Sequence, residues 1–208
     1  MNLYFIFSLS VLAAVSMNAQ NLSVGAGYLN STLTNKVGNN STSSAYQGFY
    51  AGANAAVVND GAFAITPGLF LEYLTNNNAA DFYGLVGAET TATEMYLNVP
   101  VDFSYGIALG SAKLSIFAGP TFSFGLLSNY KSNASVLGGK TNDVNTDNYG
   151  DKSSYGRFDI LVGGGLALDF ANCFRISAGY NYGLLDRNST DAIKCNRSEI
   201  HAGVAYLF

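Results

Sequence analysis

The chain has 208 residues, of which 49% are hydrophobic and 12% charged, and its formal net charge is −4. Soluble domains carry about 25% charged residues, so the composition argues against an ordinary soluble domain. The acidic balance and the lack of a block of Lys and Arg argue against nucleic acid as a partner.

Residues 1–19 are predicted to be a secretory signal peptide. Leu3–Val15 is almost wholly apolar, and Ala19 supplies a small residue before the expected cleavage. The alternative, an uncleaved anchor helix, needs about 20 apolar residues, and this run is shorter. Residues 20–208 are then expected to form one exported domain.

Apolar residues recur with a period of two along this domain, which is typical of strands with one apolar face. Gly is abundant (23 residues), and Tyr and Phe number 14 each. With no later apolar run long enough for a membrane helix, this pattern predicts an all-β, eight-stranded antiparallel up-and-down transmembrane β-barrel. The predicted strands are residues 22–29, 46–57, 62–74, 94–105, 113–127, 157–168, 174–184 and 197–208.

The predicted connections alternate between short and long. The short ones are 58–61, which contains the hairpin signal Asp60-Gly61, 106–112 and 169–173. The long ones, rich in Asn, Ser, Thr, Asp and Gly, are 30–45, 75–93, 128–156 and 185–196. Barrels of the bacterial outer membrane have short periplasmic turns and long extracellular loops. Four extracellular loops are therefore expected to carry any binding.

Aromatic residues on the outward faces gather near the strand ends, as expected of girdles at the two membrane interfaces. The predicted outer girdle is Tyr28, Phe49, Tyr73, Phe124, Phe158 and Tyr182, and the periplasmic one is Phe63, Phe103, Tyr105, Phe174, Tyr206 and Phe208. Pro67, Pro100 and Pro120 lie inside predicted strands, where each removes a ladder donor, so we expect bulges or bends there.

Several segments resemble the outer-membrane β-barrel domain family (porin-family or PorT-like proteins) of Gram-negative bacteria. These are Glu94-Met95-Tyr96-Leu97-Asn98-Val99-Pro100-Val101, Phe117-Ala118-Gly119-Pro120-Thr121, Arg157-Phe158-Asp159 with Gly163-Gly164-Gly165, and Tyr180-Asn181-Tyr182-Gly183-Leu184-Leu185. The resemblance implies an eight-stranded barrel in the outer membrane, in contact with its lipid. It also implies that the last strand, with Tyr206 and Phe208, is the signal for the barrel-insertion machinery. The resemblance does not by itself imply a transport activity.

Charged residues share the inward phase of the predicted strands in two groups. The group toward the outside is Glu72, Glu94, Arg157, Asp159, Arg197, Glu199 and His201. Toward the periplasm, Asp102 is expected beside Lys113, and Asp169 beside Arg175. A barrel of this size is just wide enough for its side chains to fill, so these residues predict a paired polar plug. The alternative is an ion path or a proton site.

No catalytic or metal site is predicted. His201 is the only His, Ser198 has the opposite strand phase, and a usual zinc site needs more than one such ligand. Cys173 falls at a predicted periplasmic turn and Cys195 at the outer end of the last predicted strand. The strand 174–184 between them spans most of the barrel height, too far for a disulfide, so both are expected to be free thiols.

The sequence thus predicts a non-enzymatic outer-membrane barrel with no cofactor and a structural or surface-interaction role through an unknown extracellular ligand or protein. Two alternatives stay open. One is a narrow porin that passes small solutes. The other is a soluble lipocalin-like carrier, which would need its apolar faces turned inward.

Overall fold

A computed structural model describes the backbone of residues 22–82, 86–136, 139–150, 155–171, 173–187 and 194–208; side chains at 79–82, 86–88, 134–136 and 139–143 are outside the description. The predicted signal peptide also lies outside the described residues. The described strands are β1 (Leu22–Val37), β2 (Asn40–Ala55), β3 (Val58–Asp60), β4 (Phe63–Phe82), β5 (Val86–Leu109), β6 (Ala112–Val136), β7 (Gly139–Asp147), β8 (Phe158–Phe170), β9 (Phe174–Gly183) and β10 (Lys194–Leu207).

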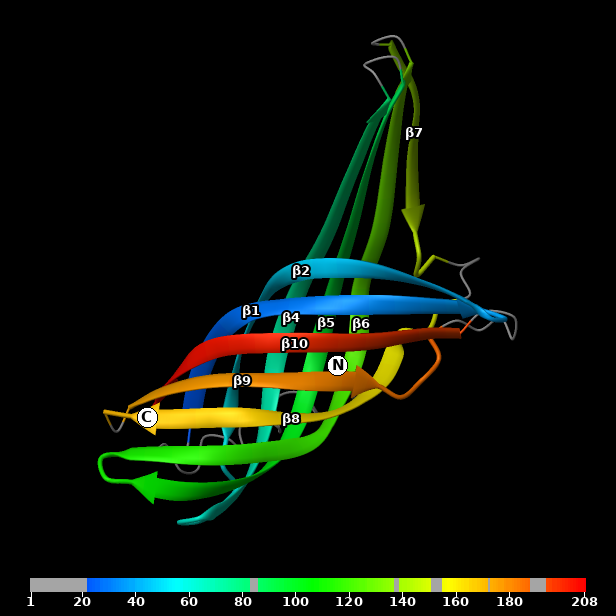
Figure 1. Ribbon diagram of the computed structural model, residues 1–208. Helices are drawn as coiled ribbons and strands as arrows, with labels where there is room; N and C mark the ends of the chain where they lie inside the picture. The colour runs from blue at the N-terminus through cyan, green and yellow to red at the C-terminus, as the bar shows by residue number, and fades with distance from the viewer. Residues whose placement is uncertain (1–21, 83–85, 137–138, 151–154, 172, 188–193) are drawn as a thin grey trace, which may run out of the picture.

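Eight of these strands close into a ring in which every neighbouring pair is antiparallel (Figure 1). The order around the ring is β1-β2-β4-β5-β6-β8-β9-β10, and the pairing of β1 with β10 closes it. The short strand β3 extends the pairing along β4, and β7 pairs only with β6. The predicted eight-stranded antiparallel barrel is confirmed.

No helix that is long and apolar enough to cross a membrane occurs among the described residues.

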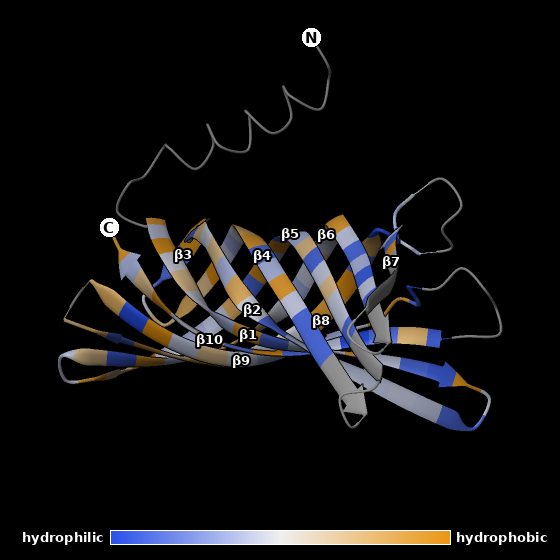
Figure 2. Ribbon diagram, turned by 90° about the horizontal axis from the view of Figure 1, so that it is seen from above, coloured by the Kyte–Doolittle hydropathy of each residue, from blue (hydrophilic) through white to orange (hydrophobic). Residues whose placement is uncertain are grey.

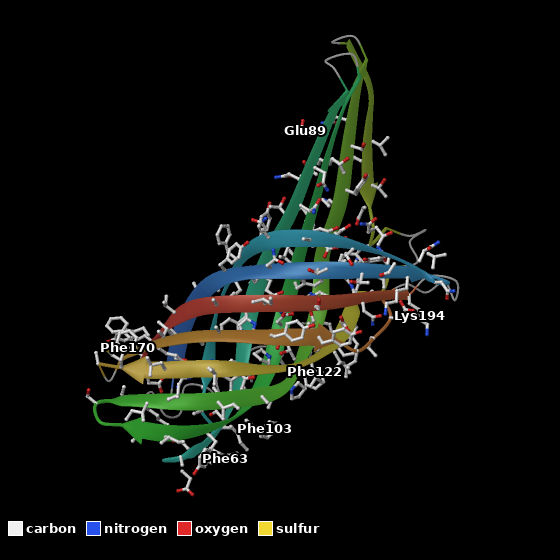
Figure 3. The ribbon with its side chains drawn as sticks, in the orientation of Figure 1. Phe63, Glu89, Phe103, Phe122, Phe170 and Lys194 are labelled. Atoms are coloured by element: carbon white, nitrogen blue, oxygen red, sulfur yellow. The ribbon has the colours of Figure 1, made fainter. Side chains whose placement is uncertain are left out.

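The outer surface of the ring carries the apolar phase of the strands. All twelve aromatics of the two predicted girdles are at least 40% exposed. Phe63, Phe103 and Phe170 project near the short-turn end, away from Glu89 and Lys194 at the other (Figure 3). Figure 2 shows hydrophobic and more hydrophilic residues alternating along the strands. The lipocalin-like alternative is wrong for this chain, because it needs the apolar faces inside.

Three of the four predicted long connections, 30–45, 75–93 and 128–156, consist largely of strand in the described residues, while most of 185–196 lies outside them. Residues 30–45 form a hairpin that turns at Gly38, where φ is +58°. Strands β4, β5, β6 and β7 rise past the rest of the barrel (Figure 1). Their four segments make one antiparallel sheet, here called the outer sheet: residues 76–82, 86–93, 128–136 and 139–147.

The prolines do not produce the expected bulges. Some paired positions are missing beside Pro67 and Pro100, but the register is the same on both sides of each gap. Pairing of β6 with β8 is continuous across Pro120, while the gap between β5 and β6 includes it. A proline removes one donor without inserting a residue, so the ladder weakens and its alignment stays. The register shift between β5 and β6 lies instead at Met95/Tyr96.

The closure seam between β1 and β10 depends on two inward-facing glycines. A Cβ placed on Gly27 or on Gly203 would overlap the ring of Tyr50, which lies across both from β2. The absence of side chains at these positions lets the tyrosine fill the lumen beside the seam. Ala202, the neighbour of Gly203 on β10, is exposed on the outer surface.

We expect Gly203→Val to lower the free energy of unfolding by about 1–3 kcal/mol, because the added atoms overpack the lumen against Tyr50. Ala202→Val should leave it within about 0.5 kcal/mol, since that side chain faces away from the lumen. The measurement is urea unfolding of the purified protein in lipid vesicles. Equal stability of the two variants would show that Tyr50 does not fix the seam.

Candidate functional site: a charged and aromatic plug in the lumen

Arg197, on β10, is the centre of one layer of side chains across the lumen. Its exposure is 0%. Its Nη2 donates to Glu72 Oε2 at 2.9 Å and to Glu199 Oε2 at 2.7 Å, and its Nη1 donates to Ser123 Oγ at 3.4 Å. The guanidinium carbon lies 4.1 Å from the centre of the Tyr96 ring. One cation therefore joins four strands of the ring from the inside.

A second layer toward the outer sheet is built on Arg187, which enters from the connection between β9 and β10. Only 2% of this residue is exposed. Its guanidinium lies 5.1 Å from the Tyr96 ring centre and 4.7 Å from that of Tyr155, and Nη2 donates to Tyr149 Oη at 3.1 Å. Nη1 lies 3.6 Å from Glu94 Oε2. The arginine thus occupies a cage of three aromatic rings and one carboxylate.

Residues between the layers join them into one cluster. Tyr96 contacts both guanidiniums, and its hydroxyl donates to Glu94. Leu29 and Leu74 pack with it as a small apolar core inside the barrel. Glu94 also accepts from Ser128 Oγ at 3.2 Å. Polar and apolar groups together fill this half of the lumen.

The tyrosines beyond the membrane-spanning strands stay neutral. Burial raises the pKa of both Tyr149 and Tyr155, so each keeps its hydroxyl proton at neutral pH. The Tyr155 hydroxyl lies 3.3 Å from Cys195 Sγ. The backbone N–H of Cys195 donates to Asp186 Oδ1 at 2.8 Å, and its carbonyl accepts from the N–H of Arg187 at 3.0 Å. These bonds hold the segment that delivers Arg187.

Most of the predicted plug residues lie inside the barrel. Glu72, Glu94, Asp159, Arg197 and Glu199 are buried. Oδ1 of Asp159 accepts backbone N–H donors from residues 160 and 185, while its Oδ2 has no hydrogen-bond partner among the described residues.

Arg157 is the exception, and its predicted inward position is wrong. The residue is exposed, and its guanidinium lies over the Tyr149 ring at 4.5 Å. Its Nη2 donates to the Tyr149 carbonyl at 3.1 Å. Strand β8 begins at Phe158, so Arg157 sits in a bend and the alternation of the strand does not apply to it.

The predicted Asp102–Lys113 pair is also absent from the described contacts. Lys113 lies opposite Ala108 on β5, six residues from Asp102, or about 20 Å along a strand. Its Nζ donates instead to the Gly61 carbonyl at 2.7 Å. Asp102 interacts electrostatically with Arg175.

Asp169 and Arg175 form the pair expected at the turn between β8 and β9. Arg175 Nε donates to Asp169 Oδ1 at 2.5 Å, and Nη2 donates to Oδ2 at 2.8 Å. The fork geometry satisfies both carboxylate oxygens at once.

The remaining candidates for chemistry show no reactive arrangement. His201 lies between aromatic rings, 6.1 Å from the centre of Tyr50 and 6.5 Å from that of Phe117. Cys173 and Cys195 are free thiols. Among the described residues, no group of three or more His, Cys, Asp or Glu side chains could hold a metal ion.

The C-terminal aromatics lie on the outer surface of the seam. Tyr206 packs edge-on against Phe174 and Phe208, with ring centres 5.7 and 5.0 Å apart. The N–H of Phe208 donates to the carbonyl of Leu22 at 2.9 Å.

Sequence reasoning missed Arg187, Tyr149 and Tyr155, all of which lie in predicted loops. One signal pointed to a missing partner. The predicted outer group, once Arg157 is removed, has four carboxylates and a single arginine. Buried carboxylates need partners, so a further cation had to come from outside the strands.

We expect Arg197→Ala to lower the free energy of unfolding by about 3–5 kcal/mol, because it leaves two buried carboxylates without their cation. Arg157→Ala is the control and should cost about 1 kcal/mol, since it removes the ring contact and backbone hydrogen bonds of an exposed side chain and leaves no buried charge unpaired. Urea unfolding in lipid vesicles measures both. Equal losses in the two variants would contradict the central role of Arg197.

Several solved structures resemble this chain at low sequence identity. No curated protein matches the chain in sequence. Among solved structures, Ail of Yersinia pestis, determined with the heparin analogue sucrose octasulfate, is 16% identical over 89% of this chain and 99% of its own, with a TM-score of 0.42. The Neisserial surface protein A (NspA) is 15% identical over 90% and 97%, with a TM-score of 0.47. The outer membrane enzyme PagL is 14% identical over 86% and 99%, with a TM-score of 0.41.

The family comparison is decisive because it covers most of the chain. The model of the outer membrane protein beta-barrel domain matches residues 15–187. With the closed ring, its outward apolar surface and its filled lumen, the match shows that the chain belongs to the outer membrane protein beta-barrel domain family.

Proposed function

We propose that this protein is a non-catalytic surface-interaction protein of the outer membrane, and that the outer sheet is its binding surface. The observation that carries the proposal is the division of the chain into a barrel whose lumen is blocked by side chains in its outer half and a projecting sheet. The two arginine layers occupy the lumen, while four segments extend past the ring. The barrel then serves as the membrane anchor of the sheet.

The outer sheet has the two free edges that a strand-like partner needs. Past Thr75, β4 pairs with β5 and no longer with β2. On the far side, β7 pairs with β6 alone among the described strands. Unpaired N–H and C=O groups along such edges bind an extended segment through backbone hydrogen bonds.

The composition of the β4 edge favours the same role. Residues 76–82 read Asn-Asn-Asn-Ala-Ala-Asp-Phe, with no Lys and no Pro. Lys and Pro are the residues that commonly keep an exposed strand edge from pairing with another chain. Asn77 and Asn78 are exposed on this edge. We propose an extended polypeptide as the extracellular partner.

Two further partners belong to the proposal. The girdle aromatics would contact outer-membrane lipid. The aromatic end of β10, with Tyr206 and Phe208, would be read by the barrel-insertion machinery after export by the predicted signal peptide. A Gram-negative bacterium as the source is part of the same proposal.

The porin alternative predicts a different conductance across a lipid bilayer. We expect the wild-type protein, reconstituted in a planar bilayer, to give no stable conductance, because the Arg197 and Arg187 layers occupy the lumen. Large, long-lived conductance steps from the wild type would favour the narrow porin and overturn the proposed role of the barrel as an anchor.

We expect proline substitution on the β4 edge to weaken peptide binding at least tenfold. A library of extended peptides would be selected on the protein in nanodiscs, and affinities measured for the wild type, Asn77→Pro and Asn78→Pro. Successive N–H groups of a strand point to opposite edges, so one of these neighbours removes a donor from the free edge.

The control is Leu166→Met on the lipid-facing surface, which should bind like the wild type. A further variant has residues 77–91 replaced by a two-residue turn. The proposal would be contradicted if the peptides bound this variant, or both proline variants, with the affinity that they have for the wild type.

A further inference from the structure

The half of the lumen toward the short turns contains a cavity of about 150 Å3. All eight ring strands contribute to its wall. Toward the outer sheet the lining reaches Glu72, Asn98 and Glu199, and neither Arg197 nor Tyr96 is part of it. One water takes up about 30 Å3 in the liquid, so the space exceeds that of a single water.

The wall is mixed: Phe70 and Phe117 supply apolar surface, Arg175 lines one side, and oxygen atoms that can accept hydrogen bonds or coordinate a cation form much of the rest. The carboxylates of Glu72, Glu199 and Asp102 line it. Hydroxyl groups complete the wall: Ser23, Thr66, Ser104, Ser115, Thr121 and Ser177. Carboxylate, amide and hydroxyl oxygens are ligands that hard cations prefer.

The charges around the cavity do not balance. Arg197 is shared by Glu72 and Glu199. Arg175 donates through Nε and Nη2 to the two oxygens of Asp169, and its interaction with Asp102 is electrostatic. Among the described residues, four carboxylates here face two guanidiniums. A buried negative charge without a partner is costly, so this wall favours positive charge.

Asn98 supplies a second observation that is independent of the charges. Only 3% of the residue is exposed, and it lines the cavity from β5. Its Oδ1 has no hydrogen-bond partner among the described residues. An amide oxygen can only accept, so it calls for a donor or a cation at this place.

We propose that this cavity binds one small monovalent cation, either an alkali-metal ion or an ammonium group, on the oxygens around Asn98. The described residues contain no group of three carboxylates close enough together to hold a metal ion jointly, so the wall does not offer what a divalent ion needs to give up its water shell. The cation enters from the short-turn end, because the arginine layers occupy the other half. The site is separate from the outer sheet, so its test does not depend on the proposed function.

The test compares thermal unfolding of the purified protein in detergent micelles in four chloride salts at equal ionic strength. N-methylglucamine is the cation that is too large for the cavity, and sodium, potassium and methylammonium are the probes. Ligand binding to the folded state raises the transition temperature, here by about 2–4 °C, and the rise should saturate. A rise with sodium or potassium identifies an alkali ion, and a rise with methylammonium alone identifies an ammonium group.

Two variants connect the effect to the site. Asn98→Leu removes the amide oxygen, and Asp102→Asn removes one negative charge with little change of shape. Each should raise the half-saturating salt concentration at least tenfold. Asn145→Leu, at an exposed position on β7, is the matched control and should respond like the wild type.

The same transition temperature in all four salts would overturn the proposal, as would a cation-dependent rise that both variants retain. If Asn98→Leu fails to fold, the comparison of the salt dependence of Asp102→Asn with that of the wild type decides whether the site exists. Broadening of the sodium NMR line by the wild type and its reversal by potassium would support the site, and no broadening together with no thermal shift would leave only water there.

Discussion

The structure depends on one constraint: within a lipid bilayer, every backbone N–H and C=O must be paired inside the protein. A sheet meets this constraint only when its first and last strands pair, and here β1 and β10 do so along most of their lengths. Since the outer surface of the ring then meets hydrocarbon, the apolar phase of each strand must point outward. The opposite phase is left to fill a narrow lumen.

The lumen shows how the polar phase is accommodated. Arginine side chains stack on tyrosine rings while their guanidiniums pair with carboxylates, so each cation satisfies charge, hydrogen bonding and volume together. Arg187 adds a contribution from outside the strands, where no alternation constrains the choice of residue. The half toward the short turns is filled less completely, and its wall is rich in acceptors.

The strands inside the membrane could be predicted because lipid imposes a period of two on them. The girdle residues, from Tyr28 to Phe208, follow from that period. Beyond the membrane both faces of a strand meet water, so residues 76–82 and 128–136 carry no alternation and resemble loops although they are strands. The prediction for Arg157 was wrong for the opposite reason. It applied the alternation of β8 to the residue that precedes the first residue of the strand. The contacts of Arg187 depend on where its connecting segment folds back, which no local pattern encodes.

The bond between Arg197 and Glu72 joins residues 125 positions apart, on β10 and β4. Both guanidiniums of the plug belong to the C-terminal part of the chain, whereas Glu72 and Glu94 are made much earlier. Until the final strand arrives, the nascent sheet therefore holds acidic groups with no counterions of their own. Neutralisation of these carboxylates therefore coincides with completion of the wall, because the residues that close the ring also carry the positive charge.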